Sequence, residues 1–164
     1  MRSTNNPDPV HRQPPWIMLH LFDPLTLLLV GRLGMDDHNG TRVLEVQGRT
    51  SGIWRATPVR VLEREGQRFL VGMYGETSWA RNLRKSGLGR LRMGREVVEF
   101  RAAEIRGDEK LAAFRAYLKR WWPLVKGLAG QESPDAPDEQ VRKVAASHPV
   151  FRLTEISAAG SNPK

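Results

Sequence analysis

Apolar and polar residues alternate with a period of two along six short stretches of the chain, a pattern typical of β-strands with one buried face. These stretches are residues 42–47, 54–63, 67–73, 88–92, 95–105 and 150–156. Two tight turns, Glu65-Gly66 and Met93-Gly94, join neighbouring stretches and predict hairpins. We therefore expect six strands that pair mainly in the antiparallel sense.

Two details refine these strands. Pro58 falls inside the second strand, and a proline there predicts a sheet edge or a bulge because it has no N–H to donate. In the strand 95–105, the expected inward residues are Val97, Phe100 and Ala102.

Apolar residues recur with helical spacing in three segments between the strands. Thr77 or Ser78 is expected to cap the first helix and Asp108 the second, because short polar side chains accept hydrogen bonds from free N–H groups at a helix start. The expected helices are residues 77–87, 108–125 and 138–146.

The leucine-rich segment 16–34 comes before all of these elements and is expected to be helical, with a kink or a second start at Pro24. It can pack on the core, pack across a dimer or lie on a membrane surface; core packing is the main expectation, since basic residues are few. Residues 1–15 and 157–164 are expected to be a disordered tail and a loose tail. The expected single domain therefore spans residues 16–156.

The order of elements is helix, three strands, helix, two strands, two helices and strand. Hairpin strands with singly inserted helices indicate an α+β fold with a small β-barrel, because the strand–helix alternation of a doubly wound sheet is missing.

Charge is concentrated in the middle of the chain. The chain has a formal net charge of +8, and residues 49–106 hold thirteen Arg or Lys against six Asp or Glu, so this segment contributes +7. Such a balance suits an anionic partner, although a solvated basic surface has the same signature.

Several chemistries are excluded or unsupported by the sequence. There are no cysteines, so disulfides, thiolate metal sites and cysteine nucleophiles are excluded. The four histidines lack metal-ligand spacing, and His148 is best read as a structural residue at the entry to the last strand. Nucleotide-binding glycine motifs and serine-hydrolase motifs are also missing. If the protein is an enzyme, a cofactor is expected to supply the reactive group.

Two segments can approach one anion from opposite ends of a hairpin. The loop Gly48-Arg-Thr-Ser-Gly52 carries small and hydroxyl residues, with Arg49 and Arg55 as charge-assisted donors, and its N–H groups are expected to turn toward the anion. Tyr74 to Trp79 leads into a helix start, where free N–H groups and the dipole favour an anion.

These segments resemble the deazaflavin (F420)-dependent nitroreductase family. The motif G-R-x-[ST]-G-x-x-R-x-x-P matches from Gly48 to Pro58, and W-x-x-N-L matches from Trp79 to Leu83. The resemblance covers roughly residues 40–156 and implies a split β-barrel of the pyridoxamine-phosphate-oxidase-like, FMN-binding type.

The resemblance also implies a cofactor site. Its expected regions are a phosphate and acidic-tail clamp at Arg49, Thr50, Ser51, Gly52 and Arg55, a ring seat at Thr57, Pro58 and Val59, and a ring-edge and ribityl segment at Met73, Tyr74, Gly75, Glu76, Thr77, Ser78 and Trp79, with Asn82 fixing the loop. Protonation is assigned to water or to a hydroxyl such as Ser78, the one candidate catalytic residue.

The implied activity is hydride transfer from reduced F420 to an electron-poor acceptor: a quinone, an enone or a nitro compound. Two alternatives stay open: an FMN-dependent oxidoreductase of the same fold, and a non-catalytic module for anionic ligands or nucleic acid. The resemblance implies a homodimer. A cytoplasmic location is the default expectation, with membrane association open through residues 16–34. No metal and no nucleic-acid partner is expected.

Overall fold

The computed structural model describes residues 40–128 and 133–156. The expected tails and the N-terminal segment 16–34 lie outside these residues. The described elements are β1 (Thr41–Gln47), β2 (Trp54–Arg64), β3 (Gln67–Val71), α3 (Ser78–Ser86), β4 (Leu88–Met93), β5 (Glu96–Glu104), α4 (Gly107–Val125), α5 (Asp138–Ala146) and β6 (Val150–Glu155).

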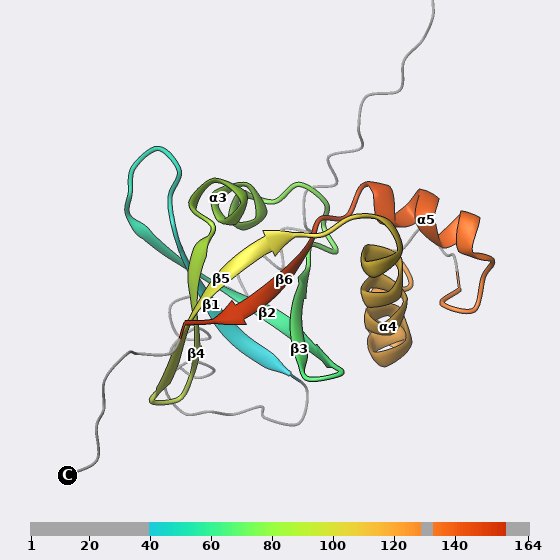
Figure 1. The fold of residues 1–164 in the computed structure, drawn as a ribbon, viewed down its shortest axis with the longest axis horizontal. Helices are drawn as coiled ribbons and strands as arrows, with labels where there is room; N and C mark the ends of the chain where they lie inside the picture. The colour runs from blue at the N-terminus through green and yellow to red at the C-terminus, as the bar shows by residue number, and fades with distance from the viewer. Residues whose placement is uncertain (1–39, 129–132, 157–164) are drawn as a thin grey trace, which may run out of the picture.

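The six strands close into an antiparallel barrel in the order β1-β2-β3-β6-β5-β4 (Figure 1). The predicted fold class is confirmed. Both predicted hairpins occur, between β2 and β3 and between β4 and β5. The first turn is Glu65-Gly66 as predicted, whereas the second is Gly94-Arg95, one residue later than predicted, because Met93 pairs with Glu96.

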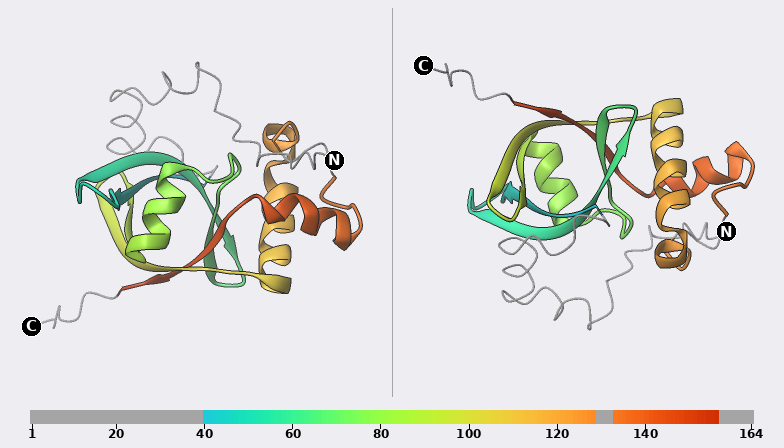
Figure 2. Two further views of the ribbon diagram at one scale, coloured as in Figure 1. Left: turned by 90° about the horizontal axis from the view of Figure 1, so that it is seen from above. Right: turned by 90° about the horizontal axis from the view of Figure 1, so that it is seen from below.

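The barrel interior is one hydrophobic core. Leu44, Leu70, Phe100 and Phe151 are almost fully buried there, and α3 contributes Leu83 to the same cluster. Seen along the barrel, α3 lies across its opening (Figure 2). Burying these side chains is the main favourable contribution to folding.

A second core lies outside the barrel wall, where α4 and α5 pack beside it (Figure 1). Phe69, Val71 and Val150 point outward into this core, whereas Leu70 and Phe151 point inward. Strands β3 and β6 are therefore buried on both faces where consecutive residues are apolar, at residues 69–71 and 150–151.

Pro58 lies at an edge, as predicted. Strand β2 pairs with β1 from Trp54 onward but with β3 only from Val61 onward. The Val61 N–H donates to Gly40 on the β1 side, so strand alternation directs the Pro58 nitrogen to the opposite, unpaired side. Among the described strands, none pairs with the first half of β2 on that side.

Three local expectations were wrong. Val97 is 40 % exposed, because residues of one strand face share a parity and Val98, not Val97, shares it with Phe100. Asp108 does not cap α4; Arg106 occupies that position, and Asp108 lies in the first turn. Strand β3 ends at Val71 because the Gly72 N–H turns to donate to the Pro149 carbonyl.

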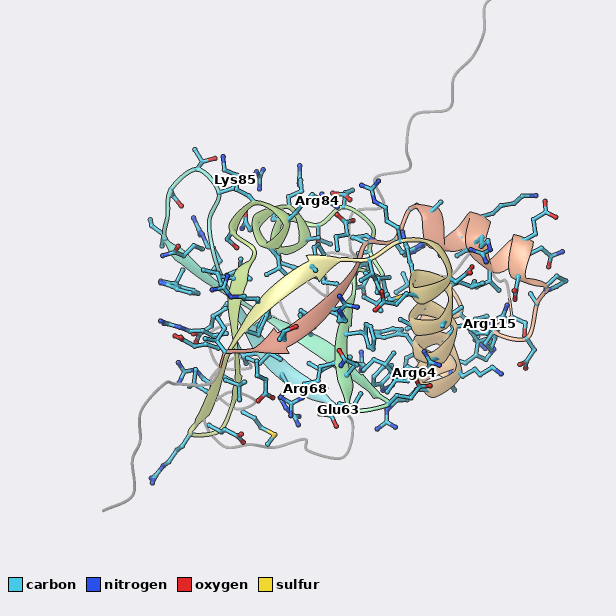
Figure 3. The ribbon with its side chains drawn as sticks, in the orientation of Figure 1. Glu63, Arg64, Arg68, Arg84, Lys85 and Arg115 are labelled. Carbon is cyan, nitrogen blue, oxygen red and sulfur yellow. The ribbon has the colours of Figure 1, made fainter. Side chains whose placement is uncertain are left out.

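Ion pairs lie at both ends of the barrel (Figure 3). Arg84 of α3 bridges Glu76 and Glu104 at one end, and Arg68 bridges Glu63 and Glu155 at the other. Arg84 therefore ties the segment before α3 to strand β5.

Candidate functional site: a cavity between the β1–β2 hairpin and helix α3

A cavity of about 680 Å³ opens between the β1–β2 hairpin and the start of α3. Both sequence motifs contribute to its wall. The lining residues are Val46, Gly48, Arg49, Thr50, Ser51, Arg55, Ala56, Thr57, Pro58, Tyr74, Thr77, Ser78, Trp79 and Asn82. Its volume is in the range of cofactor sites.

The hairpin loop at one end of the cavity is held by its own backbone. Gly48 donates to the Ile53 carbonyl and Gly52 donates back to the Gly48 carbonyl, both at 2.8 Å. Gly52 has a φ of 67°, which favours glycine, and a Cβ on Gly48 would lie 2.7 Å from the Ser51 hydroxyl oxygen. The two motif glycines thus shape the loop.

Asn82 connects this loop to α3. Its side chain is buried, and its Oδ1 accepts hydrogen bonds from the Arg49 backbone N–H (3.2 Å) and from Arg49 Nη1 (3.0 Å). The predicted contact that fixes the loop is therefore present. It locates the Arg49 side chain at the cavity.

These bonds change how an anion can be held. The N–H groups of Gly48, Arg49, Gly52 and Ile53 all donate to protein atoms, so these four do not turn toward an anion as the sequence suggested. The groups left for an anion include the guanidinium groups of Arg49 and Arg55 and the loop hydroxyls.

The two cavity arginines differ from most other arginines of the described chain. Neither Arg49 nor Arg55 makes an ion pair with a carboxylate within residues 40–128 and 133–156, and both are exposed. Arginines paired with carboxylates are Arg64, Arg68, Arg84, Arg90, Arg92, Arg115, Arg142 and Arg152. Positive charge that no described carboxylate neutralises is thus placed where an anionic ligand would lie.

The start of α3 faces the cavity from the other side. Thr77 is the N-cap, and its hydroxyl accepts from the Ala80 N–H at 3.4 Å. The N–H groups of Ser78 and Trp79 have no carbonyl to bond within the helix and carry the positive end of its dipole. Ser78 is exposed at this position; its catalytic role stays a prediction.

An apolar wall completes the cavity. Trp79 packs against the buried ring of Phe151, with ring centroids 6.0 Å apart, and this contact fixes the indole plane. Two wall residues were not singled out from the sequence, Val46 and Ala56. Alternation along β1 would have placed Val46 on the inward face, but nothing local identifies that end of the strand as a cavity wall.

Five residues expected at the cofactor are not in the cavity wall. Met73 is buried in the outer core beside α4, Val59 packs on the barrel core, and Glu76 pairs with Arg84 at 2.7 Å. Gly52 and Gly75 have φ of 67° and 75° and shape the turns that carry the lining residues. These five therefore support the cavity from behind, and their direct contact with a cofactor stays a prediction.

Hydrogen bonds to Arg84, opposed by partial burial, lower the pKa of both Glu76 and Glu104. The segment leading into α3 is thus held by an ion pair that keeps both carboxylates charged near neutral pH.

His148 lies away from the cavity. It is buried, contacts the Phe114 ring, and its Nδ1 is 2.7 Å from the Val144 carbonyl oxygen. Burial lowers its pKa. Its structural role is confirmed.

No cluster of His, Asp and Glu side chains among the described residues has the arrangement of a metal site. None of the helices described combines the length and hydropathy that crossing a bilayer requires.

A protein-family model matches residues 29–130, more than half of the chain, and it describes F420H(2)-dependent quinone reductases. The chain belongs to this family. The resemblance seen in the sequence is confirmed, and the protein is an F420-dependent reductase whose cofactor is coenzyme F420.

Solved structures agree on the fold. The chain is similar to an F420-H2-dependent reductase (FDR-A), with 19 % identity, a TM-score of 0.52, and coverage of 70 % of this chain and 94 % of that one. It is similar to a protein described as a domain-swapped dimer, with 18 % identity, a TM-score of 0.51 and coverage of 70 % and 80 %. The heme storage protein HutZ from Vibrio cholerae has 13 % identity, a TM-score of 0.51 and coverage of 74 % and 84 %. Comparison with curated protein sequences gives no match.

The residues of the cavity fit this cofactor. F420 combines a flat deazaflavin ring with a phosphate and an acidic tail. The cavity offers the complementary pair, an apolar wall at Pro58 and Trp79 and a cationic end at Arg49 and Arg55.

Proposed function

We propose that this protein reduces quinones with F420H2 bound in the cavity between the β1–β2 hairpin and α3. The observation that carries the proposal is the composition of that cavity in a chain of this family: two guanidinium groups without a carboxylate partner in the described chain at one end, and an apolar wall at the other. When bound, reduced F420 supplies a hydride from C5 of its ring.

The guanidinium groups of Arg49 and Arg55 hold the phosphate and the acidic tail. Arg49 is held for this role by Asn82, which fixes both its backbone and its side chain. Pairing a charged ligand with two guanidinium groups stabilises binding by about 1.5–3 kcal/mol for each charge-assisted hydrogen bond.

The apolar wall orients the deazaflavin ring. Pro58 and Trp79 contact its faces or edge, and the N–H groups at the start of α3, with the Ser78 hydroxyl, donate to polar atoms of the ring. The remaining open side of the cavity receives the acceptor. The residues contribute mainly orientation, which lets reacting atoms approach within about 3–3.5 Å.

A quinone is the preferred acceptor over an enone or a nitro compound. The family description names quinones, and a flat, uncharged ring suits a wall built of proline, tryptophan, valine and alanine. The assembly proposed is a homodimer, in line with the similarity to a domain-swapped dimer.

The test is an acceptor panel with reduced F420. Purified protein is mixed with reduced F420 and, in separate reactions, a naphthoquinone, an enone and a nitroaromatic compound, and recovery of oxidised F420 is followed by absorbance. The proposal expects the quinone to give the highest kcat/KM. A higher kcat/KM with the nitro compound or the enone would refute quinone as the acceptor, and activity with reduced FMN but not with reduced F420 would overturn the assignment of the cofactor site.

A further inference from the structure

Tyr74 is the one phenol among the described residues that line the cavity. It follows strand β3 and lines the cavity together with Pro58. Its side chain is half-buried. Among the cavity-lining side chains it is the strongest acid that still carries its proton near neutral pH.

Tyr74 belongs to a group of three polar side chains from three different elements. Arg60 lies on β2, two residues after Pro58, and Tyr117 lies on α4. Burial raises the pKa of Tyr74, and the positive charge of Arg60 opposes this effect. Burial also raises the pKa of Tyr117 to about 12, with Arg60 again opposing and Tyr74 adding to the rise. The charge of Arg60 therefore acts on both phenols.

The two tyrosines are not equivalent. Tyr117 is 4 % exposed, stacks with Trp121 at a centroid distance of 4.5 Å and belongs to the core beside α4. Tyr74 is the one that lines the cavity. The pair thus provides a reactive candidate and a matched internal control beside the same guanidinium.

Arg60 is held at a cost. Its Nε is buried without a hydrogen-bond partner among the described residues, and a buried donor left unsatisfied is unfavourable. Structures retain such groups where they serve a purpose, and here the guanidinium charge stabilises the phenolate that forms if Tyr74 loses its proton.

We propose that Tyr74 is the proton donor for the reduced acceptor and that Arg60 is the residue that supports it. This inference rests on the proposed function. Hydride addition brings two electrons to the quinone, oxidises the cofactor and leaves a hydroquinone oxyanion. The Tyr74 hydroxyl transfers its proton to that oxyanion; the O–H bond of the phenol breaks as the O–H bond of the hydroquinone forms, and water then reprotonates the phenolate.

The Tyr74 side chain and the hydroquinone product are both phenols and so have similar acidity. Proton transfer is efficient when donor and acceptor have similar pKa values. The Ser78 hydroxyl lies in the same wall, but an aliphatic hydroxyl is a much weaker acid than a phenol. Arg60, whose charge acts on Tyr74, lies on β2 two residues after Pro58, whereas Arg49 lies in the loop before β2. We therefore infer that Tyr74 is nearer to the ring than to the acidic tail.

The test compares Tyr74→Phe with Tyr117→Phe in the quinone reaction. For Tyr74→Phe we expect kcat to fall by about 10- to 100-fold, less than a full general-acid effect because water can substitute in part, with the dissociation constant of F420 unchanged. For Tyr117→Phe we expect an unchanged kcat. Thermal unfolding of both variants verifies the fold.

Arg60 is tested through the pH profile. Wild-type kcat should decline on the alkaline side as Tyr74 loses its proton, and Arg60→Gln should move this limb to higher pH because the charge that favours the phenolate is gone. Arg60→Lys should restore the wild-type position. A purely structural Arg60 would leave the limb in place.

Two failures are distinguishable. If the wild type does not oxidise reduced F420 with any quinone, the proposed function fails. If the wild type is active and Tyr74→Phe keeps the wild-type kcat and pH profile, the role of Tyr74 is refuted and the proposed function stands.

Discussion

Replacing Asn82 with alanine tests the contact that joins the two halves of the cavity. Asn82 is 6 % exposed, and its Oδ1 accepts two hydrogen bonds from Arg49, at 3.2 and 3.0 Å. Alanine removes both acceptor contacts and leaves the partly buried Arg49 N–H without a partner.

The expected loss can be worked from these contacts. Two hydrogen bonds of about 1 kcal/mol each, with the cost of an unsatisfied N–H, give a decrease of about 1–3 kcal/mol in the free energy of unfolding. Arg49 is also released from its position, so part of its interaction with the ligand is lost. A loss of about 1.4 kcal/mol in binding corresponds to a tenfold higher dissociation constant for F420.

Two further variants separate the causes. Asn82→Asp keeps Oδ1 and pairs with Arg49, so we expect near-normal stability but weaker F420 binding, because the added negative charge opposes the anionic tail. Lys85→Ala changes the exposed last turn of the same helix (Figure 3) and should alter stability by no more than about 0.5 kcal/mol.

The measurements are urea unfolding followed by circular dichroism and titration of F420 followed by its fluorescence. Wild-type stability together with wild-type affinity in Asn82→Ala would refute the reasoning. Weakened binding in Lys85→Ala to the same degree would show that net charge, and not loop position, controls affinity.

Two remaining predictions concern the supports of the cavity. Arg84→Gln should lower the free energy of unfolding near neutral pH by no more than about 1 kcal/mol, since the ion pairs are partly exposed. Both partner glutamates have lowered pKa values in the fold, so the contribution of the ion pairs is present above the pKa values of the unfolded chain and disappears as pH falls. The unfolding curves of the wild type and of Arg84→Gln should therefore converge in acid. Gly72→Ala would put a Cβ 2.7 Å from Pro149 Cγ and 3.1 Å from the Gly75 carbonyl oxygen, so we expect about 1–3 kcal/mol of destabilisation by thermal unfolding, and a wild-type melting temperature would contradict this packing.

The sequence alone predicts most of the barrel, because strand alternation and Gly-containing turns are local signals. The Glu65-Gly66 turn, the Thr77 cap and the Gly87 end of α3 all follow from residue chemistry and occur as expected. The error at Val97 arose from reading hydrophobicity without strict parity, and parity is itself a local rule.

The cavity was only partly predictable. Both motifs line the cavity because α3 crosses the barrel opening next to the β1–β2 loop, and only the tertiary structure brings these two segments together. Sequence could not tell that Met73 turns into the outer core or that Glu76 is held by Arg84 from α3. Neither could it tell that the loop N–H groups are used inside the protein.

Tyr74 shows the same limit. Its sequence neighbours suggested a ring-edge contact, but its placement beside Arg60 depends on β2, the turn after β3 and α4 coming together. Charges on separate elements influence the acidity of the Tyr74 hydroxyl, and a local sequence pattern does not show which charges come close to it.

The most direct test of the cofactor site is a fluorescence titration of F420 into the wild type and into the double variant Arg49→Ala/Arg55→Ala, with FMN as competitor. We predict saturable binding by the wild type that FMN displaces poorly. The double variant should lose no more than about 1 kcal/mol of stability, because the Arg49 backbone N–H still donates to Asn82 when the side-chain bond is gone. We predict that its affinity for F420 is lower by at least about 100-fold, from the loss of two charge-assisted contacts. Unchanged affinity in the double variant, or tighter binding of FMN than of F420 by the wild type, would contradict the central claim.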